Sequence, residues 1–285
     1  AYYNEHYNNL RPREYDGSFL TFPGMNPEIT LRPHQRNAVA RILFGGNTLV
    51  AHAVGAGKTI VMGAAAMEKK RLGLCSKTMI VVPNHLTEQI GSELLTLYPN
   101  ANILVAEKRD FEKDRRRLFC SRIATGNYDI VILGHSQFTR LPLSDERQQQ
   151  FLRDEIEQFT EVINAAKKER TGQELSVKQL ERAKKSLESR LEKLMDAPKD
   201  DAVTFEELGV DSLMVDEAHQ FKNLAVQTKM QNVSGITTAE SRKATHLLMK
   251  CQYLDEITGG KGVVFCTGTP ISNSAAELYT MMRYI

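Results

Sequence analysis

One stretch of the chain, residues 48–67, combines residue types and spacing that suit phosphate binding. An apolar run suited to a buried strand leads into a loop of small residues, and helical sequence follows. Glycines let backbone N–H groups approach phosphate oxygens, and a helix start adds unpaired N–H donors and a positive dipole end. A lysine there can reach the β- and γ-phosphates of a nucleotide, and a hydroxyl can bind Mg²⁺. The expected phosphate-binding residues are Gly55, Ala56, Gly57, Lys58 and Thr59.

This loop departs from the strict phosphate-loop pattern at one position. The pattern G-x-x-x-x-G-K-[ST] requires glycine at position 52, where this chain has His52. The alternative interpretation is a helix N-terminus that uses Gly-Lys-Thr only as a cap. The loop alone is compatible with both phosphate binding and a helix cap.

An acidic pair elsewhere in the chain helps to distinguish these two interpretations. Asp216 and Glu217 directly follow the apolar run 212–215. Side chains that follow parallel strands gather at the carboxyl edge of the sheet, where the glycine loop would also emerge. An acid at that edge can hold Mg²⁺ through its water shell, and its neighbour can orient and deprotonate an attacking water. Paired acids also occur in ordinary surface loops, so the combination with the glycine loop is what favours nucleotide hydrolysis.

Short apolar runs alternate with helical sequence along most of the chain. This alternation predicts an α/β fold with a central, mostly parallel sheet covered on both faces. The expected strands are 48–51, 78–82, 102–106, 129–133, 212–215 and 262–266. The expected helices are 31–44, 59–67, 86–98, 108–119, which is strongly basic, and 242–257.

Residues 144–200 break this alternation. Two apolar seams with spacings of three and four residues predict an antiparallel helical hairpin inserted into the sheet domain. We therefore divide the chain into an extended N-terminal lead-in (1–30), a nucleotide-binding lobe (31–143 and 201–285) and the inserted hairpin (144–200). Acidic and basic residues are nearly balanced in the hairpin, which favours solvated outer faces over a nucleic-acid contact. The seams are Leu152, Ile156, Phe159, Ile163 and Ala166, and Leu180, Ala183, Leu187, Leu191 and Leu194.

Composition limits the possible classes of protein. The 285 residues are 41% hydrophobic and 25% charged, as in globular proteins, and the net charge of +2 leaves any DNA contact to a local patch. Four scattered cysteines without a C-x-x-C pair indicate neither a zinc site nor a disulfide framework. No apolar run approaches the roughly 20 residues that span a bilayer, and there is no signal peptide, so we expect a cytoplasmic location without membrane contact. The first residue, Ala1, suggests a piece of a longer protein.

Taken together, these motifs resemble the first RecA-like lobe of a superfamily 2 helicase or translocase of the Snf2-like kind. Residues 216–219 read as a DEAH box, and 51–59 resemble the A-x-x-x-G-x-G-K-T form of the Walker A loop, in which the first glycine is commonly absent. Residues 267–270 resemble motif III in its T-G-T-P form, and 219–223 resemble the H-x-x-K-N run that follows the box. Similar sequences occur in large proteins of bacterial mobile elements, often joined to an adenine DNA methyltransferase.

The resemblance implies roles for individual residues. Residues 31–35 resemble the glutamine motif that reads adenine, while 81–89 and 134–138 resemble motifs Ia and Ib, which contact DNA. The resemblance implies ATP and Mg²⁺ as cofactors. The implied residues are Lys58, Asp216 and Glu217 for catalysis; Gln35, Arg32, Gly55, Ala56, Gly57, Lys58 and Thr59 for ATP; Thr59 and Asp216 for Mg²⁺; His219, Thr267 and Thr269 for coupling; and Asn84, His85, Ser136 and Gln137 for DNA.

The implied activity is ATP hydrolysis that moves the protein along DNA, duplex DNA by preference. The second lobe, which carries the arginine fingers in this family, is absent from these residues, so the isolated chain is expected to hydrolyse ATP weakly. Two alternatives stay open. One is a non-catalytic, nucleotide-gated module that binds DNA or protein in a larger assembly, against which the intact catalytic residues argue. The other is the motor part of a restriction-modification enzyme.

Overall fold

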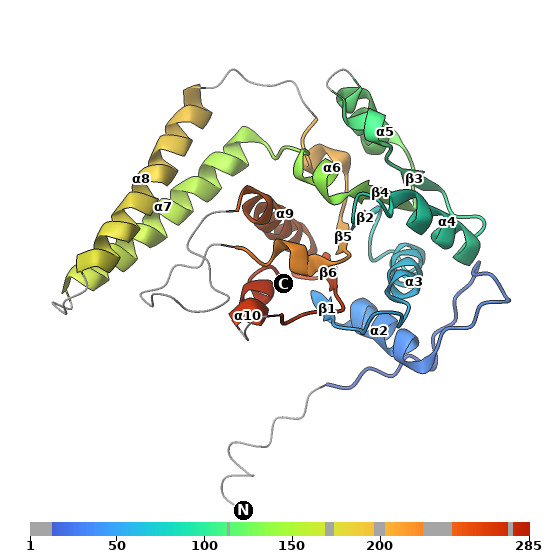
Figure 1. Cartoon of the computed structure of the whole chain (residues 1–285). Coiled ribbons are helices and arrows are strands. Elements are labelled where there is room, and N and C mark those ends of the chain that lie inside the picture. The colour runs from blue at the N-terminus through green and yellow to red at the C-terminus, as the bar shows by residue number, and fades with distance from the viewer. Residues whose placement is uncertain (1–12, 113–114, 169–173, 197–202, 225–240, 273–275) are drawn as a thin grey trace, which may run out of the picture.

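The protein contains a central parallel sheet with helices on both faces (Figure 1). The computed structural model describes residues 13–112, 115–168, 174–196, 203–224, 241–272 and 276–285. All five strand pairings are parallel, in the order β1-β6-β5-β2-β4-β3. The predicted α/β class with a mostly parallel sheet is confirmed. The strands are β1 (Thr48–Val50), β2 (Thr78–Val82), β3 (Ile103–Val105), β4 (Ile130–Gly134), β5 (Ser212–Val215) and β6 (Val263–Cys266).

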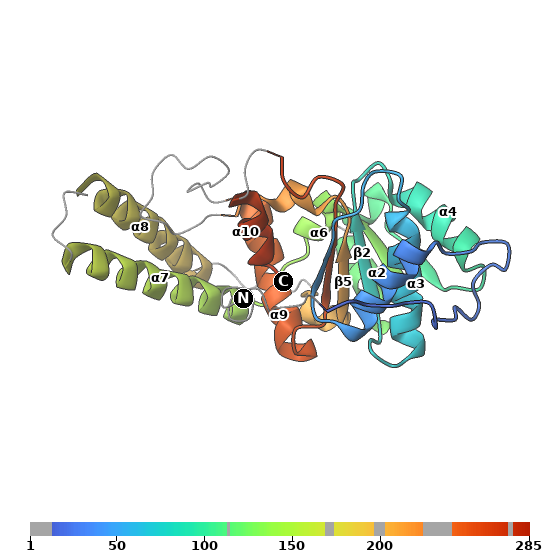
Figure 2. The same ribbon diagram turned by 90° about the horizontal axis from the view of Figure 1, so that it is seen from below.

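The two faces of the sheet belong to two separate apolar cores. The core of one face includes residues of the helices α2, α3 and α4, and the core of the other includes residues of α5, α6, α9 and α10. Figure 2 shows the sheet between α9 and α10 on one side and α2, α3 and α4 on the other. Both faces are covered, so the central strands β2 and β4 are buried along their whole length and are mostly apolar. The helices are α2 (Pro33–Phe44), α3 (Lys58–Arg71), α4 (Thr87–Leu97), α5 (Arg116–Thr125), α6 (His135–Thr139), α9 (Arg242–Thr258) and α10 (Ala276–Met282).

The prediction of one basic helix over 108–119 is wrong. A 3₁₀ turn, η1 (Lys108–Phe111), precedes α5, which begins at Arg116. In a continuous helix, Phe111 and Phe119 would be separated by about 12 Å along the axis. Instead their ring centroids lie 5.6 Å apart, and both side chains are buried in one core. The break in the helix therefore allows both rings to be buried.

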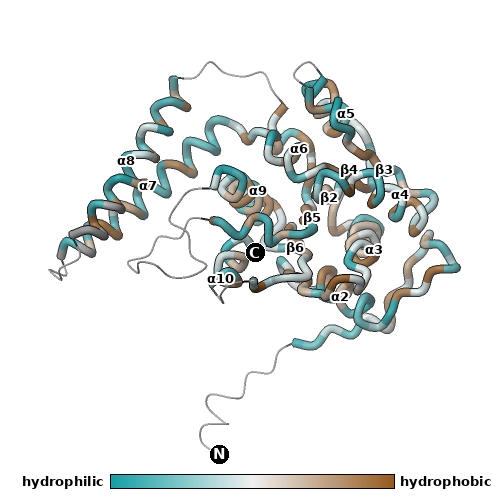
Figure 3. The backbone as a smooth tube through the Cα atoms, viewed as in Figure 1, coloured by the Kyte–Doolittle hydropathy of each residue, from teal (hydrophilic) through white to brown (hydrophobic). Residues whose placement is uncertain are grey.

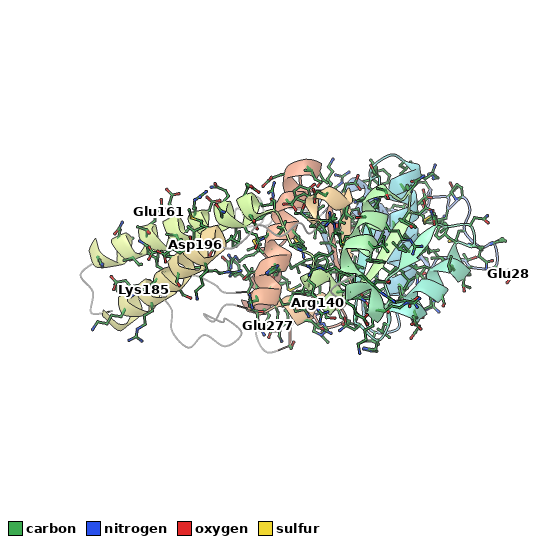
Figure 4. All side chains as sticks on the ribbon, turned by 90° about the horizontal axis from the view of Figure 1, so that it is seen from above. Glu28, Arg140, Glu161, Lys185, Asp196 and Glu277 are labelled. Carbon is green, nitrogen blue, oxygen red and sulfur yellow. The ribbon has the colours of Figure 1, made fainter. Side chains whose placement is uncertain are left out.

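Two long helices, α7 (Asp145–Lys168) and α8 (Glu174–Asp196), occupy the stretch predicted as a hairpin. They pack side by side and extend away from the sheet beyond α9 (Figures 1 and 2). Apolar and polar residues alternate along both helices in Figure 3, and the charged side chains of Glu161 and Lys185 project outward in Figure 4. Four of the predicted seam residues are buried: Leu152, Ile163, Leu180 and Leu187. The side chain of Ala166 lies outside the described residues.

The described part of the N-terminal lead-in has neither helix nor strand. Residues 1–12 of this segment lie outside the described residues. Asn26 donates from its backbone N–H to the carbonyl of Leu97 at 2.8 Å, and Leu20 is buried in the core that α2 and α3 share. No helix in the described part of the chain has the length and apolar character needed to cross a membrane.

Candidate active site

The carboxyl ends of five neighbouring strands bring the predicted functional segments to one edge of the sheet. β1, β6 and β5 are adjacent, and they lead into the loop 51–57, Thr267 and Asp216 respectively. β2 and β4, adjacent to each other, lead toward Asn84 and His135. Since the strands are parallel, one half of this edge carries the predicted nucleotide residues and the other half carries the predicted DNA residues. β5 and β2 meet at the boundary between the halves.

Two glycines shape the loop between β1 and α3. Gly55 and Gly57 have φ angles of 81° and 79°, in the left-handed region that glycine adopts at little cost. Gly57 is the N-cap of α3, so Lys58 and Thr59 begin the helix, as the sequence predicts. The Lys58 ammonium lies 3.4 Å from the carbonyl oxygen of His52 and 3.5 Å from that of Ala53. These distances are long for hydrogen bonds, so the ammonium can exchange the carbonyls for phosphate oxygens at small cost.

Gln35 braces this loop from α2. Its side chain is 5% exposed; Oε1 accepts from the backbone N–H of Arg32 at 2.8 Å, and Nε2 donates to the carbonyl of Ala56 at 3.0 Å. His34 Nε2 lies 3.1 Å from the same carbonyl. The side chain of Arg32 is exposed. Adenine recognition by Gln35 and Arg32 stays a prediction, and the observed contacts give Gln35 a bracing role that the sequence did not indicate.

Replacing the two loop glycines with alanine should separate backbone strain from crowding. Both positions require a left-handed backbone, which costs other residues about 1–2 kcal/mol. A Cβ at Gly57 would also lie 2.3 Å from Gln35 Nε2, whereas a Cβ at Gly55 meets nothing within 4 Å. We expect Gly57→Ala to lose about 1–3 kcal/mol more ATP-binding free energy than Gly55→Ala, because Gln35 must move. Calorimetric titration with ATP measures the difference, and equal losses would contradict the bracing role.

The acidic pair follows β5 directly, as predicted. Asp216 is 7% exposed, and burial, the largest cause, raises the pKa of its carboxyl group. Its Oδ1 is buried and has no hydrogen-bond partner among the described residues. A buried carboxylate oxygen without a partner is costly unless a cation or donor joins it, so Asp216 suits the Mg²⁺ role predicted for it. A shared site with the Thr59 hydroxyl stays a prediction. Glu217 has φ 48°, the only non-glycine positive φ angle in the described residues. Such strain often marks functional positions.

His219 connects the acidic pair to the end of β6. His219 Nδ1 lies 3.1 Å from Glu217 Oε2, 3.0 Å from Thr267 Oγ1 and 3.3 Å from Thr269 Oγ1. Thr267 is fully buried, and its Oγ1 also accepts from the backbone N–H of Thr269 at 3.1 Å. The three residues predicted to couple motifs therefore meet at one ring nitrogen. Their functional role stays a prediction.

A second link between the same segments was not predicted. Lys222 donates to Ser272 Oγ at 3.0 Å and to Glu277 Oε1 at 2.9 Å, and Glu277 Oε2 accepts from the backbone N–H of Ser272 at 2.7 Å. Glu277 is nearly fully buried. Lys222 belongs to the H-x-x-K-N run, so this motif is tied to the segment after β6. The motif alone does not identify Glu277 as the partner.

Three of the four predicted DNA residues line one open hollow of about 570 Å³. Asn84 Oδ1 accepts from the backbone N–H and the hydroxyl of Ser136, both at 3.0 Å, which joins the loops after β2 and β4. Gln137 does not line the hollow: its Oε1 accepts from the Gly134 N–H at 2.7 Å, and its Nε2 donates to the Glu107 carbonyl at 2.9 Å. The lining residues are Pro83, Asn84, His85, His135, Ser136, Thr139, Arg140, Gln220 and Lys243.

Arg140, Lys243 and His135 are among the lining residues of this hollow that the sequence did not single out. Arg140 follows the end of α6, and Lys243 lies in the first turn of α9, so neither position has a local motif. His135 was read only as part of motif Ib, yet it is 3% exposed, and burial lowers its pKa to about 4. Arg140 and Lys243 give the hollow two cationic side chains, which suits a phosphate ligand.

Comparison with known proteins identifies the family. A family profile described as "Probable helicase domain" matches residues 42–285. The chain belongs to this helicase domain family. Its sequence is 22% identical over 325 aligned residues to the defense against restriction protein B of Escherichia phage P1, which covers all of this chain and 14% of that protein. It is 26% identical over 168 residues to the uncharacterized ATP-dependent helicase YqhH of Bacillus subtilis (strain 168), covering 53% of this chain and 29% of YqhH.

A solved structure supports the same fold. The SWI2/SNF2 ATPase core of Sulfolobus solfataricus, determined in complex with dsDNA, matches 94% of this helicase domain and 38% of its own chain. The TM-score is 0.50 and the identity 16%. This likeness concerns the fold, and the resemblance to a helicase is confirmed by the family profile. The domain spans less than a third of the length of either curated relative it matches.

Proposed function

We propose that this helicase domain is the first, ATP-binding lobe of an ATP-dependent DNA translocase, which hydrolyses ATP to move along duplex DNA. The observation that carries the proposal is the position of the Gly55–Thr59 loop and of Asp216 and Glu217 at one sheet edge, after β1 and β5, the two strands that flank β6. A loop suited to phosphates and an acidic pair at one sheet edge are the two parts that phosphoryl transfer to water requires. The dsDNA complex of the Sulfolobus solfataricus core supports the choice of duplex.

The chemistry assigned to the site uses this chain's own residues. Lys58 and the N–H groups at the start of α3 neutralise charge on the phosphates. Glu217 orients the attacking water and accepts its proton, and His219 holds the Glu217 carboxyl group from 3.1 Å. Thr59 and Asp216 would hold Mg²⁺, which would supply positive charge against the phosphates. A second lobe, elsewhere in a longer parent chain, would complete the site.

The hollow beside β2 and β4 is the proposed DNA contact. Asn84, His85 and Ser136 line it and are predicted to contact DNA. Arg140 and Lys243 add the positive charge that attracts a phosphate backbone. ATP binding would close the two lobes on the DNA, and hydrolysis would reopen them. Gln137 would then support this surface through its contact with the Glu107 carbonyl.

We also propose that α7 and α8 (within 144–200) form an insertion, that 31–143 and 201–285 form the lobe, and that 1–30 is an N-terminal lead-in. The two helices follow β4 and the short helix α6 in the chain, and they pack mainly on each other. The parent protein is proposed to act in the bacterial cytoplasm, to be encoded by a mobile element and to carry a methyltransferase domain elsewhere in the chain.

ATP turnover by the longest natural chain that contains this sequence tests the proposed function. We expect duplex DNA to stimulate kcat more than single strands do, because the proposed motor acts on duplex. Stimulation by single strands alone would instead indicate an unwinding helicase. ATP binding without turnover under any condition would overturn the motor and favour a nucleotide-gated module.

A further inference from the structure

The hollow shares a structural element with the catalytic turn. Gln220, one of its lining residues, belongs to the short 3₁₀ helix η3 (Ala218–Phe221). η3 begins directly after Glu217, which is its N-cap residue. A ligand in the hollow therefore touches the same turn that presents the acidic pair. The hollow and the acidic pair are therefore parts of one continuous site.

His135 forms the inner part of the connection. Its ring packs edge to face on Phe221, with centroids 5.1 Å apart, and is almost completely buried. Nε2 lies 2.9 Å from the carbonyl oxygen of Asp216, and Nδ1 lies 2.9 Å from Oε1 of Gln220. Since a carbonyl oxygen can only accept, the Nε2–H group donates to Asp216. One buried ring thus fixes the backbone of Asp216 and also touches Gln220.

Lys243 forms the outer part of the connection. Its ammonium lies 3.4 Å from Gln220 Oε1 and 4.1 Å above the centre of the Phe221 ring. A phosphate in the hollow would compete for this ammonium and remove its charge from beside the Gln220 amide. Because the neutral ring donates through Nε2–H, its Nδ1 can only accept, so it forms a hydrogen bond with the Gln220 amide only when the NH₂ group faces it. The amide oxygen faces Nδ1 where Lys243 holds that oxygen, and release of Lys243 lets the amide turn its NH₂ group to Nδ1. The contact between Gln220 and His135 therefore has two discrete arrangements.

We infer that Lys243, Gln220 and His135 form a coupling relay, through which a nucleic-acid phosphate in the hollow sets the position of Asp216 and Glu217. The inference rests on the proposed function, because it assigns the route by which DNA stimulates ATP hydrolysis. Glu217 lies between two points of the relay: the Asp216 carbonyl, held by His135, and Gln220 in η3. Its left-handed backbone is strained, so a small shift of η3 changes where the carboxylate points. His135 and Gln220 are positioning residues, since they act through the acidic pair.

Gln220→Leu in the longest natural chain tests the relay. Gln220 is exposed, so the substitution should not unfold the protein. Leucine is similar in size to glutamine but cannot make the amide contacts to His135 and Lys243. We expect the ratio of kcat with saturating duplex to kcat without DNA to fall at least about fivefold, the lower end of typical coupling between sites. KM for ATP and the duplex dissociation constant, measured by fluorescence anisotropy, should stay near the parent values. Gln158→Leu, the same change at an exposed position of α7, is the matched control.

His135→Phe provides a second test from inside the protein. The substitution keeps an aromatic ring against Phe221 but removes the contacts to Asp216 and Gln220. We expect a similar fall in the stimulation ratio. Because the change also leaves the Asp216 carbonyl without its donor, its melting temperature should be compared with that of the parent chain. The Gln220→Leu result decides the inference if His135→Phe does not fold.

Three other results would overturn the relay. A parent-like ratio in Gln220→Leu, with the unchanged chain stimulated by duplex, would overturn the relay and leave the motor intact. An unchanged chain that no DNA stimulates would overturn both. A lower ratio together with an equal loss of duplex affinity would make Gln220 a DNA contact and would also overturn the relay.

Discussion

Glu217→Gln is expected to lower kcat for ATP hydrolysis by about 10²–10⁴-fold, the usual contribution of a positioned general base. The amide has nearly the same shape as the carboxylate but cannot accept a proton from the attacking water. Glu217 Oε2 lies 3.1 Å from His219 Nδ1, a contact that the amide can keep. The variant should therefore retain ATP and DNA binding while it loses turnover. Single-turnover hydrolysis and equilibrium binding of ATP, both on the longest natural chain, measure the two effects separately.

The matched control is Glu157→Gln, which makes the same change at an exposed position of α7 and should leave kcat as it is. Turnover of Glu217→Gln at the parent rate would show that another group activates the water. A parallel loss of ATP affinity would point instead to a structural role for Glu217 at its strained turn. Only a loss of kcat with binding retained supports the proposed base.

The sheet could be predicted because its strands carry a simple signal. Strands buried on both faces are apolar throughout, and here they are separated by glycine, proline or helical sequence, as at 78–82 and Pro83. Parallel strands also place their carboxyl ends together, so residues that follow different strands could be expected to meet. For this reason the proximity of the Lys58 loop and Asp216 was predictable although 158 positions separate them in the sequence.

The break between η1 and α5 could not be predicted from local pattern. Residues 108–119 have helical composition throughout, but burial of Phe111 against Phe119 requires the chain to turn between them. Packing between residues in different elements overrides local propensity in such cases. The aromatic pair gives no signal of its own in the sequence, because its spacing is compatible with either structure.

The parts of the candidate site that were missed all depend on contacts between distant segments. Lys250, which lies outside the candidate site, shows the same problem: it is fully buried on α9, and its ammonium donates to the Phe138 carbonyl at 2.8 Å. In the sequence it is an ordinary helix lysine, which would be expected to face solvent. His135 and Lys243 were missed for the same reason, since their partners Asp216 and Gln220 lie on other elements. A motif identifies residues that lie close together in one segment of the sequence. These contacts instead form only when the folded chain brings distant segments together.

Lys58→Ala is expected to weaken both ATP binding and catalysis, in contrast to Glu217→Gln. A hydrogen bond to a charged group contributes roughly 1.5–3 kcal/mol, so ATP affinity should fall about 10- to 100-fold. The Lys58 ammonium would also stabilise charge that develops on the phosphates, and loss of one such donor typically lowers kcat about 10²–10³-fold. Both losses should appear in the longest natural chain, as a higher ATP dissociation constant in calorimetric titration and as slower turnover at saturating ATP.

The protein itself should remain folded in this variant, because the hydrogen bonds of the Lys58 ammonium within the described residues are the two long contacts to the carbonyls of His52 and Ala53. Lys185→Ala, an outward-facing lysine of α8 (Figure 4), is the control for removing one positive charge and should bind ATP as the parent does. Parent-like ATP affinity in Lys58→Ala would mean that the backbone N–H groups of the loop suffice for binding. The residues around Gly57 would then act as a helix cap, and the phosphate role of the loop would lose its main support.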